Sequence, residues 1–156
     1  MNKTKKQESG RSMVEMVGVL AIMGLITAGA FVLLGSRYRS QKRSRATDEI
    51  DLIASNVRAM GAQAENNSTK FDKLPAGDTD NGQKKGIALA TALLDSADGA
   101  TPFGGSYGAY QIDRGAKFAI KMIGIDASEC EAMAGRQYKY GTPACEGRTV
   151  TITFTE

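Results

Sequence analysis

Residues 16–34 form a run of nineteen apolar or small residues without a charged side chain. At about 1.5 Å rise per residue, a helix of this length comes close to spanning the roughly 30 Å hydrocarbon core of a bilayer. The run therefore predicts a membrane-spanning helix near the start of the chain. It also constrains the rest of the fold, because about 110 residues remain for a folded domain, enough for a modest core.

A single carboxylate, Glu15, directly precedes this run. An ionised side chain close to hydrocarbon costs several kcal/mol or more, and such residues usually mark function. We therefore expect Glu15 to have a specific partner. The segment also carries glycines, which would weaken a soluble helix but suit close packing of membrane helices. These are Gly18, Gly24, Gly29 and Gly35.

Charge is divided unevenly along the chain. Residues 1–45 carry nine Lys/Arg against two acidic residues, a balance of +7, whereas residues 46–156 carry eleven against fifteen, a balance of −4. A nucleic-acid reader concentrates positive charge on its folded domain, but here the basic residues flank the apolar run. We therefore do not expect direct binding of nucleic acid.

The chain has no histidine, which removes the usual general base at neutral pH and the commonest zinc ligand. Any serine or cysteine nucleophile also lacks its usual activator. No spacing singles out a pair of carboxylates for acid–base catalysis. We expect a protein that is not an enzyme and that uses no metal or cofactor.

The two cysteines are Cys130 and Cys145. Their spacing leaves open the alternative of two reduced thiols in a cytosolic protein, but a membrane segment upstream favours export and oxidation. A disulfide between them would stabilise the fold by roughly 3 kcal/mol.

Two interpretations of the apolar segment need no partner for Glu15. One is a plain N-terminal anchor. The other is a cleaved secretory signal peptide, since a basic region precedes the run and residues 28–30 fit the small-x-small cleavage rule. Against it, the apolar run continues beyond that point to Leu34. Basic residues lie on both sides, so the positive-inside rule does not settle the topology.

A third interpretation uses Gly10, Arg11 and Glu15 together. A short basic leader ends in Gly10, an apolar helix follows, and Glu15 is the fifth residue after that glycine. This arrangement resembles the N-terminus of type IV pilins and pseudopilins, whose class III signal peptide is recognised by prepilin peptidase. Family members usually begin the mature chain with Phe, Met or Leu, where this chain has Arg11. The helix lacks the proline common in the type IVa branch and looks more like the type IVb branch.

The resemblance implies cleavage between Gly10 and Arg11, usually with N-methylation of the new amino terminus. It also implies a partner for Glu15, whose carboxylate meets the N-terminal ammonium of a neighbouring subunit in the assembled filament. Compensation of an otherwise unpaired buried charge would select and register incoming subunits.

Beyond the apolar run we expect the helix to continue, with one apolar stripe facing a folded head. The stripe consists of Ile50, Ile53, Ala54, Val57, Met60 and Gly61. Residues 37–45 form a cationic collar, interpreted as a solvated face near lipid headgroups. Residues 62–85 are polar and predict an exposed loop, and residues 87–94 predict a short helix.

The C-terminal part predicts strands over residues 107–112, 117–124 and 148–154. In the last of these, valine, isoleucine and phenylalanine alternate with threonine. Residues 126–129 resemble a capping box and predict the start of a helix that carries Cys130. Tyrosines at four positions are expected to cover the sheet, although they could be read as a surface for stacking bases. They are Tyr107, Tyr110, Tyr138 and Tyr140.

The predicted fold is α+β and pilin-like, with a long N-terminal helix, membrane-spanning in its first half, packed on a small antiparallel sheet of three or four strands. The predicted organisation is a leader peptide over 1–10, a transmembrane and filament-core helix over 11–35, a helical continuation on the head over 36–62, and a globular head over 63–156. The order of strand, Cys130 helix and Cys145 is similar to type IVb pilins of the enteric and conjugative thin-pilus kind, whose disulfide encloses the C-terminal D-region.

The resemblance implies a structural subunit of a type IV (IVb-like) pilus that polymerises with copies of itself. Its expected partners are prepilin peptidase, the pilus assembly platform and other pilins. Before assembly it would be a single-pass protein of the bacterial inner membrane with a periplasmic head, and afterwards part of a cell-surface pilus for adhesion, transport or conjugation. The alternatives are a minor pilin or type II secretion pseudopilin and, from another class, a membrane-anchored periplasmic enzyme or binding domain.

Overall fold

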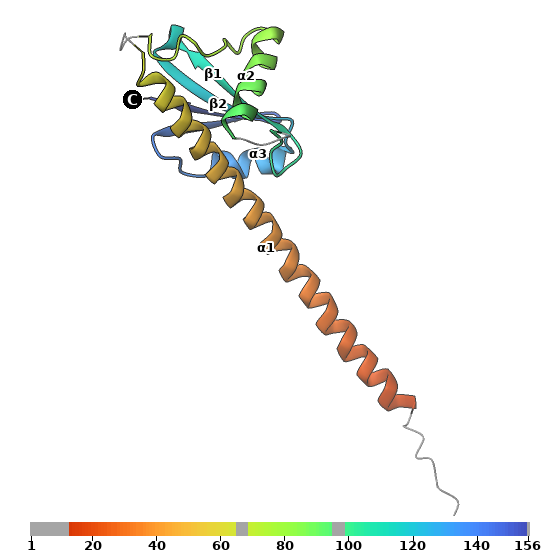
Figure 1. Ribbon diagram of the computed structural model, residues 1–156. Coiled ribbons are helices and arrows are strands. Elements are labelled where there is room, and N and C mark those ends of the chain that lie inside the picture. The colour runs from red at the N-terminus through yellow and green to blue at the C-terminus, as the bar shows by residue number, and fades with distance from the viewer. Residues whose placement is uncertain (1–12, 65–68, 95–98, 156) are drawn as a thin grey trace, which may run out of the picture. The chain divides into compact units, whose positions relative to one another are not determined.

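The computed structural model describes residues 13–64, 69–94 and 99–155 (Figure 1). Contacts divide the chain into two units, residues 1–40 and residues 41–156. We call residues 13–40 the N-terminal segment and residues 41–156 the head. In chain order the elements are α1 (Met13–Gly61), α2 (Asp80–Leu93), β1 (Ser106–Ile112), the 3-10 turn η2 (Asp113–Gly115), β2 (Lys117–Ile123), α3 (Ala127–Ala134), β3 (Gly141–Glu146) and β4 (Thr149–Phe154).

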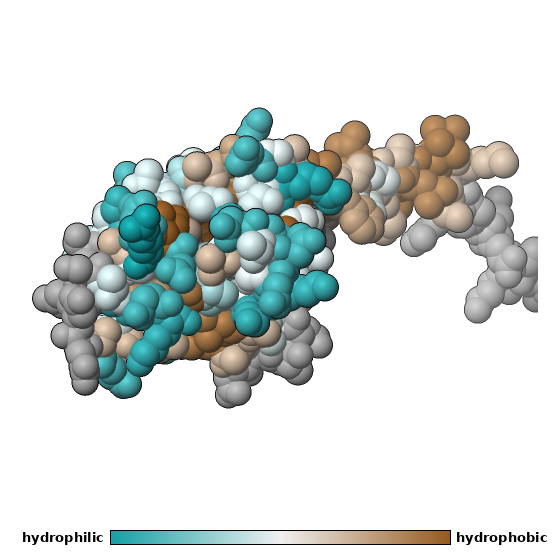
Figure 2. Space-filling model, turned by 90° about the horizontal axis from the view of Figure 1, so that it is seen from above, coloured by the Kyte–Doolittle hydropathy of each residue, from teal (hydrophilic) through white to brown (hydrophobic). Residues whose placement is uncertain are grey.

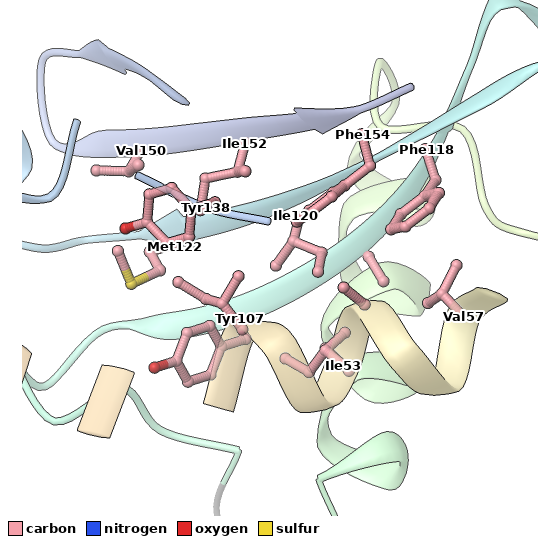
Figure 3. Close-up of a cluster of buried hydrophobic side chains, with 14 of the residues drawn as sticks. Ile53, Val57, Tyr107, Phe118, Ile120, Met122, Tyr138, Val150, Ile152 and Phe154 are labelled. Atoms are coloured by element: carbon pink, nitrogen blue, oxygen red, sulfur yellow. The ribbon is translucent and has the colours of Figure 1, made fainter. Parts of the chain in front are cut away.

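The head is an α+β unit, as the sequence predicts. Its sheet has four antiparallel strands in the order β1-β2-β4-β3. The second half of α1 packs on one face of this sheet, and Figure 3 shows Ile53 and Val57 of the helix facing the sheet residue Ile120. A long N-terminal helix on a small antiparallel sheet is consistent with a pilin-like fold.

The predicted stripe of α1 forms one side of the core. Ile50, Ile53, Ala54 and Val57 are completely buried, and burying one such aliphatic side chain stabilises a fold by about 1.5–3 kcal/mol. The prediction is wrong for Met60, which is expected in the buried stripe but is 41% exposed. At this end of the helix the ring of Phe71 packs so closely against Gly61 that a Cβ there would collide with it. The ring closes the core and leaves Met60 outside.

The alternating patterns of β2 and β4 also place their residues as predicted. Val150, Ile152 and Phe154 are buried. Phe154 lies opposite Phe118 in the register of the two strands, and their rings stack with centroids 4.8 Å apart. Strand β3 has no clear pattern of its own and contains Pro143, which is tolerated because β3 is an edge strand.

The predicted loop over residues 62–85 is wrong at its end, because α2 begins at Asp80. Thr79 caps this helix, its hydroxyl oxygen accepting a hydrogen bond from the Gly82 backbone N–H at 3.1 Å. Glycines at the start of α2 lower its helix propensity, which hides the helix in the sequence. Gly86 has a packing reason, since a Cβ there would collide with the ring of Tyr110.

Helix α3 begins where predicted, but the capping box does not form. Asp126 is the N-cap residue, yet its side chain makes no capping hydrogen bond. Glu129, the second member of the expected box, instead accepts two hydrogen bonds from Arg43 on α1. The carboxylate thus joins two helices rather than closing the end of one.

Candidate functional site

The N-terminal segment exposes apolar side chains all round the helix. The exposed fraction of its large apolar residues runs from 49% at Val19 to 86% at Met13. Figure 2 shows brown, apolar residues along this helical segment. By length and composition, α1 is one helix able to cross a membrane, and its most apolar stretch has no buried residue. Such a surface calls for lipid or other helices around it.

Glu15 lies in the first turn of α1 and is exposed. A helix N-terminus stabilises a carboxylate by about 0.3–1 kcal/mol, which is small beside the cost of a carboxylate near hydrocarbon. Within the described residues no hydrogen bond or ion pair engages the Glu15 carboxylate. In an apolar environment Glu15 therefore needs a partner that is not among the described residues.

The glycines of the N-terminal segment contact nothing in the described chain that would explain them. A Cβ on any of the four would meet no atom within 4 Å. At about 100° per residue, Gly24 and Gly35 share one helix face with Ala21 and Ala28. Glycine in a helix interior costs about 1 kcal/mol relative to alanine. This face of small residues suits close approach by another helix.

Gly10 and Arg11, the predicted cleavage site, lie outside the described residues, as does the whole predicted leader. Cleavage, methylation of Arg11 and the pairing of Glu15 with an amino terminus all stay predictions. What the structure adds is the state of Glu15 itself, which is exposed at the start of an apolar helix.

The head contains the predicted disulfide. Cys130 on α3 is bonded to Cys145 on β3, with their Cα atoms 5.6 Å apart. Cys130 is completely buried and Cys145 packs against the core. The bond therefore attaches α3 to the edge strand of the sheet.

An ion pair that the sequence does not predict joins α1 to α3. Arg43 Nε donates to Glu129 Oε2 at 2.7 Å and Nη2 donates to Oε1 at 3.1 Å. The hydrogen bonds to Glu129 raise the pKa of Arg43 above its ordinary value. Nearby, Arg136 Nη1 donates to the Thr47 hydroxyl at 3.1 Å. Contacts between residues this far apart in sequence leave no local signal.

A second polar group centres on Glu49. Its carboxylate accepts a hydrogen bond from the Tyr107 hydroxyl at 2.8 Å and another from Arg45 Nε at 2.8 Å. Burial and then the hydrogen bond to Glu49 raise the pKa of Tyr107 far above its usual range. The i, i+4 spacing of Arg45 and Glu49 is the one sequence signal for this group.

Three of the four tyrosines are buried in the head. Tyr107, Tyr110 and Tyr138 are buried, whereas Tyr140 is 68% exposed. Burial raises the pKa of Tyr138 to about 12. The burial of these three rings is the result expected of aromatic residues that cover the sheet.

A groove of about 680 Å³ lies on the face of the sheet away from α1. Its floor includes Tyr110, with Lys121 Nζ 5.3 Å from the ring centroid. Arg114, which also lines the groove, has a left-handed backbone at φ 56°. Acidic residues Asp78 and Glu146 line it as well, so the groove has no dominant charge.

Among the described residues, no group of three or more His, Cys, Asp or Glu side chains is placed to hold a metal ion. The fold and the site define a class of protein in which an apolar helix of membrane-spanning length is joined to an α+β head that contains a disulfide. Comparisons with models of known families, with curated proteins and with solved structures give no match.

Proposed function

We propose that this chain is the structural subunit of a type IV (IVb-like) pilus, processed by prepilin peptidase between Gly10 and Arg11 and polymerised through its N-terminal helix. The observation that carries the proposal is Glu15, an exposed carboxylate at the start of an apolar helix without a cation beside it among the described residues. The amino terminus of a neighbouring subunit, freed by cleavage before Arg11, supplies that cation.

The magnitude of the interaction supports an ammonium as the partner. Two unit charges about 4 Å apart attract by about 4 kcal/mol at an effective dielectric constant of about 20. The N-terminus of the helix contributes at most about 1 kcal/mol at an exposed position. A full positive charge is therefore the compensation that a desolvated Glu15 needs when the helix enters a filament core.

Assembly then exchanges one apolar environment for another. Before assembly the apolar run lies in the inner membrane, with the head in the periplasm. On polymerisation the lipid contacts of the helix are replaced by contacts with neighbouring helices. The faces that carry Gly18 and Gly24 give those neighbours room to approach, because a Cβ there has open space around it.

The test is the pair of variants Glu15→Gln and Asp48→Asn. Each removes one negative charge from α1, and both carboxylates are exposed. Glu15→Gln leaves the neighbour's ammonium buried without a partner, at a cost of about 3–5 kcal/mol. We expect Glu15→Gln to abolish filaments while the head stays folded and disulfide-bonded, and Asp48→Asn to assemble normally. Normal filaments from Glu15→Gln would contradict the proposal.

The mass of the mature chain tests the processing step separately. A start at Arg11 supports cleavage by prepilin peptidase, and the same spectrum measures methylation. Retention of Met1 indicates a plain anchor, and a start at Phe31 indicates a secretory signal peptide. The composition of purified filaments distinguishes a major pilin from a minor pilin or pseudopilin. Filaments that consist mainly of this chain identify it as a major pilin.

The groove on the outer face of the sheet favours one candidate from another class, a membrane-anchored binding domain. Mixed charges from Arg114, Lys121 and Glu146 around the groove suit a small polar ligand. In that case Glu15→Gln leaves function unchanged, whereas a reversal of charge at Lys121 removes it. The two variants together separate a filament subunit from an anchored binding protein.

A further inference from the structure

Residues 35–40 form a short exposed stretch of α1 between the apolar run and the head. They are all exposed, and partial burial against the head begins at Lys42. Six helical residues cover about 9 Å, which is close to the roughly 5–7 Å of polar headgroup layer on each side of a bilayer. When the apolar run spans a membrane, this stretch lies at headgroup depth.

The stretch carries the side chains that suit this depth. Tyr38 is 61% exposed, and tyrosine is enriched at membrane interfaces because it combines an apolar ring with a polar tip. Arg37 and Arg39 lie on either side of it in sequence and are exposed. A guanidinium binds phosphate through two parallel hydrogen bonds.

The other arginines of the cationic collar differ because the head supplies their partners. Arg43 pairs with Glu129, and Arg45 pairs with Glu49. Arg37 and Arg39 have no acidic residue three or four positions away on the helix, where an ion pair would form. No ion pair of either arginine is found among the described residues, so their positive charge is available to an anion outside this part of the chain.

The directions of the two arginines favour lipid over a protein partner. Residues two apart on a helix project about 200° apart, so Arg37 and Arg39 point to opposite sides of α1. A protein partner contacts one side of a helix, whereas lipid headgroups surround it.

We propose that Arg37 and Arg39 bind the phosphates of anionic phospholipids at the interface on the head side of the membrane, where the ring of Tyr38 also lies. The inference rests on the proposed function, because it concerns the membrane-embedded subunit before assembly. It also fixes the depth of the helix. Glu15 lies 22 residues before Arg37, about 33 Å along the helix, which places its carboxylate at the opposite interface, where water can hydrate it until assembly.

The chain has no tryptophan, so Tyr38→Trp introduces a single fluorescent reporter into the full chain. The protein is reconstituted in phosphatidylcholine vesicles that contain equal mole fractions of either brominated phosphatidylglycerol or brominated phosphatidylcholine. We expect stronger quenching by the anionic lipid, corresponding to roughly fivefold local enrichment for each arginine. Adding Arg37→Gln and Arg39→Gln should abolish the difference. Adding Lys84→Gln and Lys85→Gln, which removes the same charge from exposed positions on α2, should leave it unchanged.

Equal quenching by the two lipids would overturn the lipid site and leave the membrane-spanning helix intact. Quenching that follows the protein-to-lipid ratio rather than lipid charge would also overturn it, in favour of contact with a second copy of the chain. An absence of quenching by either lipid would contradict both the lipid site and the membrane-embedded subunit of the proposed function.

Discussion

The two halves of α1 obey different rules although they form one continuous helix. From Ala46 to Val57 the buried positions follow one stripe, and the sheet covers it. From Met13 to Leu33 the apolar side chains are exposed on every side. A helix that is apolar all round is made for an apolar environment. The head therefore buries the apolar face of its part of α1 within the chain, whereas the apolar surface of the N-terminal segment needs lipid or other helices to cover it.

Charges follow the same division. In the head, Glu129 and Glu49 each accept hydrogen bonds from an arginine. In the N-terminal segment, Glu15 has no such partner among the described residues. These two carboxylates of the head are therefore satisfied within the chain, whereas Glu15 is not satisfied by any residue that the structure describes.

The largest expected effect compares the same substitution in the two halves of α1. Ile53→Ala removes a completely buried side chain and should lower the free energy of unfolding of the head by about 2–5 kcal/mol. Ile22→Ala removes a side chain that is 63% exposed and should leave that free energy unchanged. Denaturant unfolding of the full chain in detergent measures both. Equal destabilisation by the two variants would contradict the division of α1 into a buried half in the head and an exposed half outside it.

Removal of the disulfide should have a somewhat smaller effect, confined to the head. Cys130→Ala with Cys145→Ala should lower its free energy of unfolding by roughly 3 kcal/mol, because the unfolded chain is no longer constrained. Membrane insertion of the N-terminal segment should not change. A count of two free thiols in the native protein would contradict the predicted bond.

Alkaline pH should destabilise the head as its buried tyrosines ionise. Burial raises the pKa of Tyr138 from 10.0 to about 12, so above pH 10 the unfolded chain releases a proton that the folded head retains. Stability is full below pH 10 and is lost as pH rises towards 12, by on the order of 2 kcal/mol. Tyr138→Phe should remove this contribution and make the loss of stability above pH 10 less steep, while the contribution of Tyr107 remains. A wild-type profile that is flat above pH 10 would show that Tyr138 is not buried.

The smallest expected effect on stability comes from two arginine variants on either side of the boundary between the N-terminal segment and the head. Arg43→Gln removes the ion pair with Glu129, whose side chain is 13% exposed, and should cost about 1 kcal/mol of head stability. Arg39→Gln makes the same change of charge four residues earlier and should alter stability by less than about 0.5 kcal/mol. Thermal unfolding of the two variants under the same conditions provides the measurement. If Arg39→Gln were the more destabilising, the boundary would be misplaced.

Local patterns predicted the elements whose period is regular. The alternation of Val150, Ile152 and Phe154 predicted both a strand and its buried face, and the spacing of Ile50, Ile53 and Val57 predicted the buried side of α1. Strand β3 and the start of α2 carry no such pattern, since Pro143 in the strand and glycines in the helix weaken any local signal. The α+β class followed from the strong elements together.

The candidate site was only partly predictable for a physical reason. Glu15 stands out because a charge next to hydrocarbon is conspicuous in any sequence. The pair of Arg43 with Glu129 does not, because residues 86 apart in sequence meet only in the fold. Residues 126–129 even carry a local pattern for a capping box, and the long-range ion pair replaced it.

The most direct test of the central claim is the distance between Arg11 and Glu15 of neighbouring subunits in a filament. Solid-state NMR on filaments mixed from two populations, one with ¹⁵N and the other with ¹³C, detects contacts between different subunits. We expect a coupling between the Arg11 α-nitrogen and the Glu15 carboxylate carbon that corresponds to roughly 3.5 Å, as in a charge-assisted hydrogen bond. Well-ordered mixed filaments without that coupling would contradict it.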